Sequence, residues 1–210
     1  MLKELREKYK FDKWTIIGII CLIIIISGFF GWLYEVIFYY FNSGMKQIYN
    51  RGANFLPWIN IYFYGGMLIT FLAYKYKNKP LKVFLISLVV CGILELVAGW
   101  ALYGLLKMHP RCWSYNEEIL SFGNIGGYVC LRSVLFFGVS GLFLVYAIIP
   151  FCIFLAKKMP RTLFLIITIG LCSIIMIDEI YNFIVVRVLP LPSASEIYKT
   201  KGIKYIYFNS

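Results

Sequence analysis

The segment WTIIGIICLIIIISGFFGWLYEVIFYYF, residues Trp14–Phe41, decides the fold class, because Glu35 is its one charged residue. About 20 apolar residues suffice for a helix to cross a hydrocarbon core of about 30 Å. Lipid offers the backbone no hydrogen-bond partners, so a spanning segment outside a barrel must be helical. The run also exceeds the roughly 7–15 residues of a signal-peptide core and lacks a small-residue cleavage site. We therefore expect an uncleaved first transmembrane helix.

Composition extends this conclusion to the whole chain. Its 210 residues are 61% hydrophobic and 15% charged, whereas soluble domains are about half apolar and a quarter charged. The net charge of +11 would suggest nucleic-acid binding in a soluble protein. Here most cationic residues lie in short loops beside apolar runs, which is the pattern that orients helices in a bilayer. The sequence predicts an integral membrane protein that binds no nucleic acid.

The fold class predicted from the apolar runs is all-α, a polytopic bundle of about five spans. A basic cytoplasmic segment at 1–13 precedes a transmembrane bundle at 14–189, and a tail follows at 190–210. The expected spans are about 14–41, 57–76, 81–106, 125–156 and 162–189. The N-terminal segment and the loops Lys75–Lys82 and Lys157–Arg161 carry the excess of lysine and arginine. This excess predicts that the N-terminus lies inside, and five spans then place the C-terminus outside.

Several charged residues interrupt the apolar spans. Each costs at least about 2.5–3.5 kcal/mol on insertion scales, so such residues usually face the bundle interior. At 1.5 Å per residue, all of them are expected in the outer half of the bilayer or near its midplane. Together with Arg51 in the first outer loop, they form the predicted substrate or ion cavity: Glu35, Arg51, Glu95, Arg132, Asp178 and Glu179. The alternative is that Arg132 and one or two carboxylates are structural ion pairs.

The neighbours of these acids favour close packing and hydrogen bonding. Gly31 lies one helical turn before Glu35, and Gly92 and Gly99 flank Glu95. Small residues on such a face let helix backbones approach one another. Asn182 lies four residues after Asp178 and is a candidate hydrogen-bond partner on the same helical face. Asp178 and Glu179 differ by about 100° around the helix, so we expect at most one of them to point into the cavity.

The longest break between apolar runs is the stretch Trp113–Arg132. It is rich in glycine, asparagine and aromatic residues, and it brings Arg132 into the fourth span. We predict an outer-loop gate formed by Trp113, Tyr115, Asn124 and Gly127. Aromatic residues gather at the outer ends of several spans, where they fit either an interfacial belt or the lining of a ligand cleft.

Motifs for other chemistry are missing from the sequence. It has no P-loop, no G-x-S-x-G and no H-E-x-x-H, so it predicts neither nucleotide hydrolysis nor a known hydrolase site. His109 has no ligand partner at zinc-site spacing, and no metal or cofactor is predicted. None of the six cysteines forms C-x-x-C. A bridge between Cys112 and Cys130 on an oxidising face stays open, because spacing alone does not settle it.

The outer loops resemble the bacterial ABC-transporter type IV membrane family, also called CmpB-like, over about residues 28–145. The resemblance rests on Gly31-Trp32-Leu33-Tyr34-Glu35, Asn50-Arg51-Gly52, Pro57, Ile61-Tyr62, Gly65, Leu94-Glu95, Trp113-x-Tyr115, Asn124-Ile125, Gly127 and Val129-Cys130-Leu131. The chain departs from the family at three positions. Ser114 stands where the family typically has Asp, Tyr128 where it has Arg, and Asn60 where it has Pro. Arg132, four residues after Tyr128, is expected to supply the charge on the same helical face.

The resemblance implies a permease-like, multi-pass protein of the bacterial cytoplasmic membrane. We expect it to bind or move a small or lipidic solute through an outward-facing polar cavity. Its expected partners are membrane lipids, a separate ATPase subunit or another membrane protein, and a second copy of itself. Two alternatives stay open: a membrane enzyme that acts on lipid headgroups, and a non-catalytic scaffold or sensor whose buried ion pairs are structural.

Overall fold

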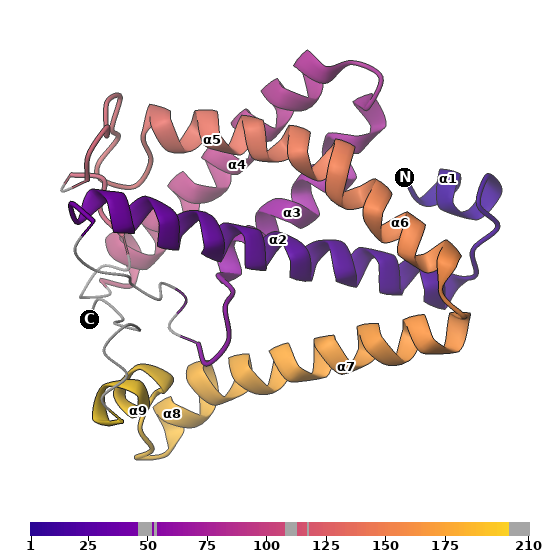
Figure 1. The fold of residues 1–210 in the computed structure, drawn as a ribbon. Helices are drawn as coiled ribbons and strands as arrows, with labels where there is room; N and C mark the ends of the chain where they lie inside the picture. Colours follow the sequence, from indigo (N-terminus) through magenta and orange to yellow (C-terminus); the bar gives the residue numbers. More distant parts are fainter. Residues whose placement is uncertain (46–51, 53, 108–112, 117, 202–210) are drawn as a thin grey trace. The chain divides into compact units, whose positions relative to one another are not determined.

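The computed structural model describes residues 1–45, 52, 54–107, 113–116 and 118–201, which are mostly helical (Figure 1). The only β-type pairing among these residues is one antiparallel bridge between Ile125 and Val129. The helices are α1 Leu2–Glu7, α2 Lys13–Asn42, α3 Asn60–Leu72, α4 Pro80–Gly99, α5 Leu131–Phe143, α6 Ile149–Lys158, α7 Arg161–Ile180, α8 Val186–Val188 and α9 Ala194–Thr200. A 3₁₀ turn covers Tyr74–Tyr76, and π-helical turns cover Trp100–Leu105, Leu144–Ile148 and Tyr181–Val185.

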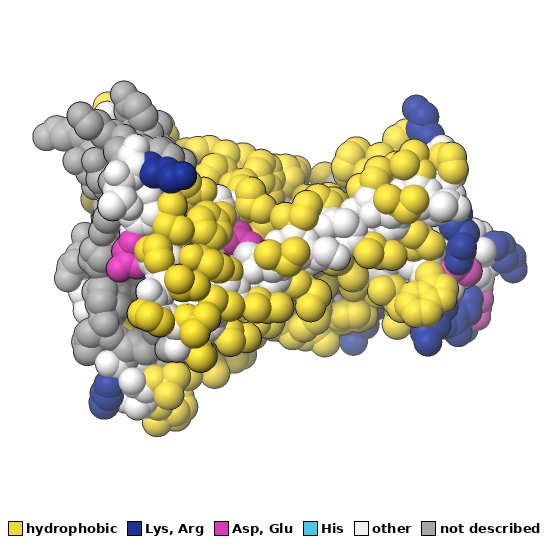
Figure 2. Space-filling model, turned by 90° about the horizontal axis from the view of Figure 1, so that it is seen from below, with side chains coloured by type: hydrophobic (Ala, Val, Ile, Leu, Met, Phe, Trp, Pro, Cys, Tyr) yellow, Lys and Arg dark blue, Asp and Glu magenta, His cyan; other side chains and the backbone are white. Residues whose placement is uncertain are grey.

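Within the described part of the chain, four helical stretches are long and apolar enough to cross a membrane. Joined through their π-helical turns, they are Lys13–Asn42, Pro80–Leu105, Leu131–Lys158 and Arg161–Val185. They confirm the all-α class and match the predicted first, third and fifth spans closely. Figure 2 shows hydrophobic side chains over much of the viewed face. On α7, Ile166, Ile169, Met176 and Ile177 are each more than 60% exposed, as expected of side chains that meet lipid.

The predicted second span corresponds to α3, which has 13 residues and is about 20 Å long at 1.5 Å per residue.

The predicted start of the fourth span was wrong. Residues 125–130 form a turn and the bridge, and α5 begins at Leu131. The reason is the pair Gly126 and Gly127, whose φ angles are +62° and +77°, a region that a right-handed helix excludes. Arg132 is therefore the second residue of α5.

The chain divides into two compact units. The first contains Met1–Phe11 and Tyr64–Phe154, and α4 packs against α5 within it. A Cβ atom added at Gly141 would lie 2.0 Å from Ser87 Oγ, and one at Gly92 would lie 3.2 Å from Val134. Small residues thus let these two helices approach closely, which is the main source of helix association in lipid.

The second unit contains Asp12–Phe63 and the described residues from Leu155 onward, and α2 packs along α7 within it. Asp12 caps α2 by accepting hydrogen bonds from the backbone N–H groups of Trp14 at 2.9 Å and Thr15 at 3.3 Å. Arg161, the first residue of α7, donates to the same carboxylate at 2.8 and 3.0 Å. The starts of α2 and α7 are therefore joined, and the two helices run parallel.

Candidate functional site

A buried carboxylate in the first unit joins a candidate spanning helix to the loop that precedes α5. Glu95 of α4 is 6% exposed. The Tyr115 hydroxyl donates to its Oε1 atom, and the Ser133 hydroxyl lies 2.8 Å from Oε2. Ser133 Oγ is also 2.9 Å from the carbonyl oxygen of Cys130. Because a hydroxyl has one proton, Ser133 donates to only one of these oxygens at a time.

The loop that carries Tyr115 is folded by its own hydrogen bonds. Tyr115 N donates to the carbonyl oxygen of Gly127 at 3.1 Å, and the indole Nε1 of Trp113 donates to that of Tyr128 at 3.0 Å. Asn124 Oδ1 accepts from Gly127 N at 2.8 Å. All four predicted gate residues thus belong to one hydrogen-bonded cluster, whose two strands of chain are held together by backbone and side-chain contacts.

Arg132 completes this cluster. Its Nη2 atom lies 2.7 Å from Glu118 Oε2, and its guanidinium carbon lies 5.4 Å from the centre of the Tyr115 ring. The Arg132 side chain is only 14% exposed, and the Glu118 side chain is only 7% exposed. Glu118, a loop residue, was not among the predicted site residues. Its signal in the sequence is an acid in the loop that leads directly into the helix of the arginine, rather than in a neighbouring span.

A second cluster of acids lies in the second unit, near the end of α7. Asp178 is 4% exposed and accepts from the backbone N–H groups of Phe55 and Leu56 at 3.0 and 3.1 Å, and from Asn182 at 2.7 Å. The predicted contact between Asp178 and Asn182 is confirmed. Glu179 accepts from the amides of two residues beside the start of α3, Asn54 at 3.1 Å and Asn60 at 2.8 Å.

At most one of Asp178 and Glu179 was expected to point into a cavity, and the structure shows contacts of both side chains with one segment of the chain. Both carboxylates bind the same segment, 54–60, because that segment lies across the end of α7 and supplies donors to each. The sequence did not identify Asn54 and Asn60 as site residues. Their signal is a pair of amides on either side of Pro57 and Trp58, immediately before an apolar helix.

Glu35 of α2 also lies in the second unit, where it accepts from the Tyr62 hydroxyl at 3.2 Å. The predicted close packing one turn earlier is confirmed, because a Cβ atom at Gly31 would lie 2.0 Å from the Tyr62 ring. Arg51 and Cys112 lie outside the described residues. Of the predicted residues, Glu95 and Arg132 thus lie in the first unit, and Glu35, Asp178 and Glu179 lie in the second.

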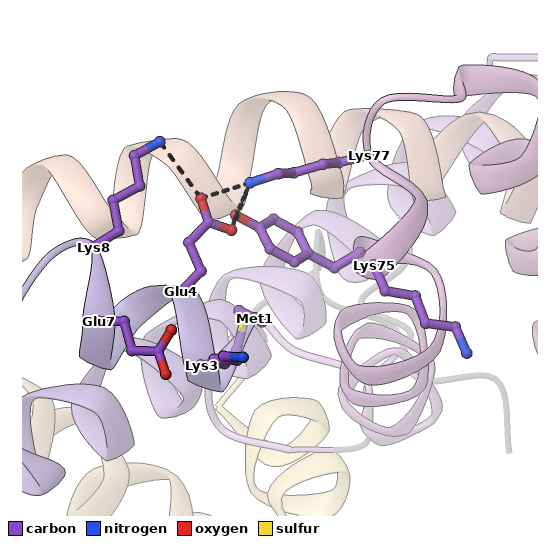
Figure 3. Close-up of a pocket in the computed structure, with 8 residues that line it drawn as sticks. Met1, Lys3, Glu4, Glu7, Lys8, Lys75 and Lys77 are labelled. Carbon is purple, nitrogen blue, oxygen red and sulfur yellow. Dashed lines mark hydrogen bonds and ion pairs between the residues drawn. The ribbon is translucent and has the colours of Figure 1, made fainter.

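A separate pocket of about 390 Å³ lies beside α1 in the first unit (Figure 3). Glu4 occupies its centre, within 2.5 Å of Lys77 Nζ and 3.8 Å of Lys8 Nζ. Burial alone would raise the pKa of Glu4, but hydrogen bonds from Lys77 and Tyr74 outweigh burial and hold that pKa below its usual range. Its lining residues are Met1, Lys3, Glu4, Glu7, Lys8, Tyr74, Lys75 and Lys77.

Comparison with protein families gives one match, to the family described as "Putative ABC-transporter type IV", over residues 14–183. The chain belongs to this family. The matched region includes α2 to α7 and both acidic clusters, so these clusters lie within the part of the chain shared with the type IV family. Searches of curated proteins and of solved structures found no match. Membership makes this chain a multi-span membrane protein of an ABC-transporter family.

Proposed function

We propose that this type IV family member is the permease-like subunit of a transporter in the bacterial cytoplasmic membrane. It would bind or move a small or lipidic solute through an outward-facing polar cavity. The observation that supports this best is Glu95, a carboxylate inside a candidate span that an outer loop covers with Tyr115. A charged group in a span is expensive and usually functional.

The contacts suggest how the gate would operate. Tyr115 holds the loop onto Glu95, and Arg132 holds the loop through Glu118 and the Tyr115 ring. If the loop moves away, Glu95 loses the Tyr115 hydroxyl and needs another donor. A solute with an ammonium or hydroxyl group can supply that donor. Arg132, released from Glu118, can in turn hold an anionic headgroup.

Five crossings with the N-terminus inside fit the contacts within each unit. In the first unit, α4 and α5 run antiparallel, since Glu95 meets Ser133 near one end and the backbone of Lys77 meets Tyr146 near the other. The two helices therefore cross in opposite directions, and the chain returns to the side from which α4 started. In the second unit, α2 and α7 start together. We therefore propose that the chain between them crosses once more through the segment 43–79, which contains α3.

Cysteine labelling tests this topology. A cysteine at Ser43 should react with an impermeant maleimide on intact cells, and one at Lys79 only after permeabilisation. Ser121→Cys, in the outer loop, is the positive control for outside labelling, and the native chain measures background from its own cysteines. Reaction of Ser43→Cys and Lys79→Cys from the same side would show that 43–79 does not cross.

The function itself is tested by purification of the tagged native chain followed by mass spectrometry of proteins, lipids and small molecules. We expect an ATPase subunit or a solute enriched over a control multi-pass protein purified identically. Light scattering of the same sample reports a second copy of the chain. A preparation with neither ATPase nor enriched solute would contradict the permease assignment.

A membrane scaffold is the second candidate, and one observation favours it. Each of the four acids within the candidate spans, Glu35, Glu95, Asp178 and Glu179, accepts hydrogen bonds from side chains or backbone. Paired acids of this kind can fix helix order without binding a ligand. In that case Glu95→Gln and Arg132→Ala should reduce the amount of folded protein and its function equally, whereas a transport role predicts a larger loss of function.

A further inference from the structure

Asp178 and Glu179 are adjacent acids of the second unit, and their described hydrogen-bond partners are neutral. Asp178 and Glu179 together carry two negative charges. Among residues 1–45, 52, 54–107, 113–116 and 118–201, leaving aside the side chains of Arg187 and Lys199, no lysine or arginine forms an ion pair with either one. Their hydrogen-bond donors are backbone N–H groups and asparagine amides. Amide donors stabilise a carboxylate but leave its net charge unbalanced in a low-dielectric region.

Two amide oxygens beside Glu179 are also unsatisfied. Asn54 is fully buried, and its Nδ2 atom is turned onto Glu179 Oε1 at 3.1 Å. Asn60 is oriented in the same way onto Oε2 at 2.8 Å. The Oδ1 atoms of both residues are buried, and no hydrogen-bond partner for either is present in the described part of the chain. A buried acceptor without a partner costs about 1–3 kcal/mol, so these oxygens indicate an additional positively charged or donating ligand.

The free acceptor capacity is concentrated around Glu179. Asp178 already accepts three N–H donors, which nearly fills the four or so lone-pair positions of a carboxylate. Glu179 accepts two asparagine amides, and the buried indole Nε1 of Trp58 also lies close to it, which leaves about one position. With the carbonyl oxygens of Asn54 and Asn60, this gives an all-oxygen donor set, the kind that hard cations such as Ca²⁺ and Na⁺ prefer.

We propose that Glu179, Asn54 and Asn60 form a binding site for a hard metal cation, with Asp178 as the neighbouring charge that favours a divalent ion. Binding to the site is independent of the proposed function, and its use in transport rests on that function. The ion neutralises the carboxylates and satisfies the amide oxygens. Substrate ammonium groups and protons are the competing ways to balance the same charge.

The segment that carries the amides is held in place by contacts other than the acids. The Tyr198 hydroxyl donates to the carbonyl oxygen of Phe55 at 2.8 Å, and Phe55 packs edge to face on the Tyr198 ring and at a tilt on the Tyr181 ring. A preorganised second shell of this kind holds ligands in position before the ion binds. The π-helical turn Tyr181–Val185 begins two residues after Glu179, and such turns are frequent at functional sites.

The test is direct binding of radioactive calcium and, separately, radioactive sodium to the purified full-length protein in detergent. We expect saturable binding of about one ion per chain. Glu179→Gln should weaken it at least about tenfold, since even the loss of a second-shell partner costs 10- to 100-fold. Glu196→Gln is the matched control: it removes one carboxylate from the same unit, at Ser193, and should bind as the native chain does.

A second measurement needs no variant. The thermal midpoint of the native protein should rise with CaCl₂ or NaCl compared with choline chloride at equal ionic strength, because a ligand that binds the folded state stabilises it. Absence of binding and of any thermal shift with both ions would overturn the proposal, as would unchanged binding by Glu179→Gln. Neither result would alter the copurification test, so failure of the cation site and failure of the permease assignment are distinguishable.

Discussion

The hydroxyl pair on Glu95 makes the most quantitative prediction. Tyr115→Phe and Ser133→Ala each remove one hydroxyl beside the carboxylate without removing the carboxylate itself. Hydrogen bonds to charged groups contribute about 1.5–3 kcal/mol in soluble proteins, whereas polar contacts between membrane helices average about 0.6 kcal/mol and reach about 1.7. Because Glu95 is 6% exposed, we expect each single substitution to cost about 1–2 kcal/mol of unfolding free energy.

The double variant should cost more than the sum of the two. After Tyr115→Phe, Ser133 can turn its single proton fully towards Glu95, which limits the loss. After both changes, Glu95 loses both of these hydroxyl donors, and a lost donor to a buried acceptor costs about 1–3 kcal/mol. We therefore expect the double variant to lie at least about 1 kcal/mol beyond additivity.

The assay is reversible unfolding in mixed micelles of increasing denaturing detergent, followed by tryptophan fluorescence. Tyr146→Phe is the matched control, because its hydroxyl donates to the backbone carbonyl oxygen of Lys77 on an exposed part of the chain and should matter by less than about 0.5 kcal/mol. The unfolding free energies lost in Tyr115→Phe and Ser133→Ala would be additive within about 0.3–0.5 kcal/mol if the two sites were independent. That result would refute the conclusion that both hydroxyls interact with the Glu95 carboxylate.

Arg132→Ala should cost about 3 kcal/mol in the same unfolding assay, because it leaves the buried Glu118 carboxylate without its partner, and adding Glu118→Gln should restore part of that loss. Gly31→Ala should destabilise the protein by about 1–3 kcal/mol, because the added Cβ would lie 2.0 Å from the Tyr62 ring. Gly170→Ala is the control: it has open space around it and should be neutral or stabilising. The arginine that joins α7 to α2 holds the pKa of Asp12 well below its usual range. Stability from this contact is therefore present above about pH 4, the ordinary carboxyl value, and is lost as the pH falls towards the folded pKa. The thermal midpoint of Asp12→Asn should lie below that of the native chain at pH 7, and this difference should narrow as the pH is lowered below about 4.

The membrane class and the long helices were predictable from the sequence because they follow from runs of apolar residues. The bounds of Lys13–Asn42 were predicted within one residue of Trp14–Phe41. The start of the fourth span was not predictable in this way. Ile125–Cys130 is apolar apart from its two glycines, and hydropathy alone does not register that Gly126 and Gly127 adopt positive φ and end the loop with a turn.

The site was partly predictable for a related reason. An acid in an apolar run is conspicuous, so the sequence identified Glu95, Asp178 and Glu179. Their partners are ordinary polar residues at large sequence separations: Asn54 lies 125 residues from Glu179. A single sequence contains no local pattern that connects residues so far apart. Glu118, which pairs with Arg132, was missed because it lies in a loop. Acids are common in loops, so its position did not distinguish it from other polar residues.

The contacts of the loop that precedes α5 also bear on Ser114 and Tyr128, its two departures from the family resemblance. Tyr128 precedes α5, so the expected helical relation between Tyr128 and Arg132 was wrong. Instead, Trp113 and Tyr115 bond to residues 128 and 127, which brings position 114 near position 128. Under the resemblance, Ser114 and Tyr128 stand where the family typically has Asp and Arg, so the two departures are neighbours in the fold. Tyr128 packs on Gly99, where an added Cβ would approach to 2.9 Å. The loop keeps an ion pair elsewhere, between Glu118 and Arg132, and this pair lies against the same Tyr115 ring that covers Glu95.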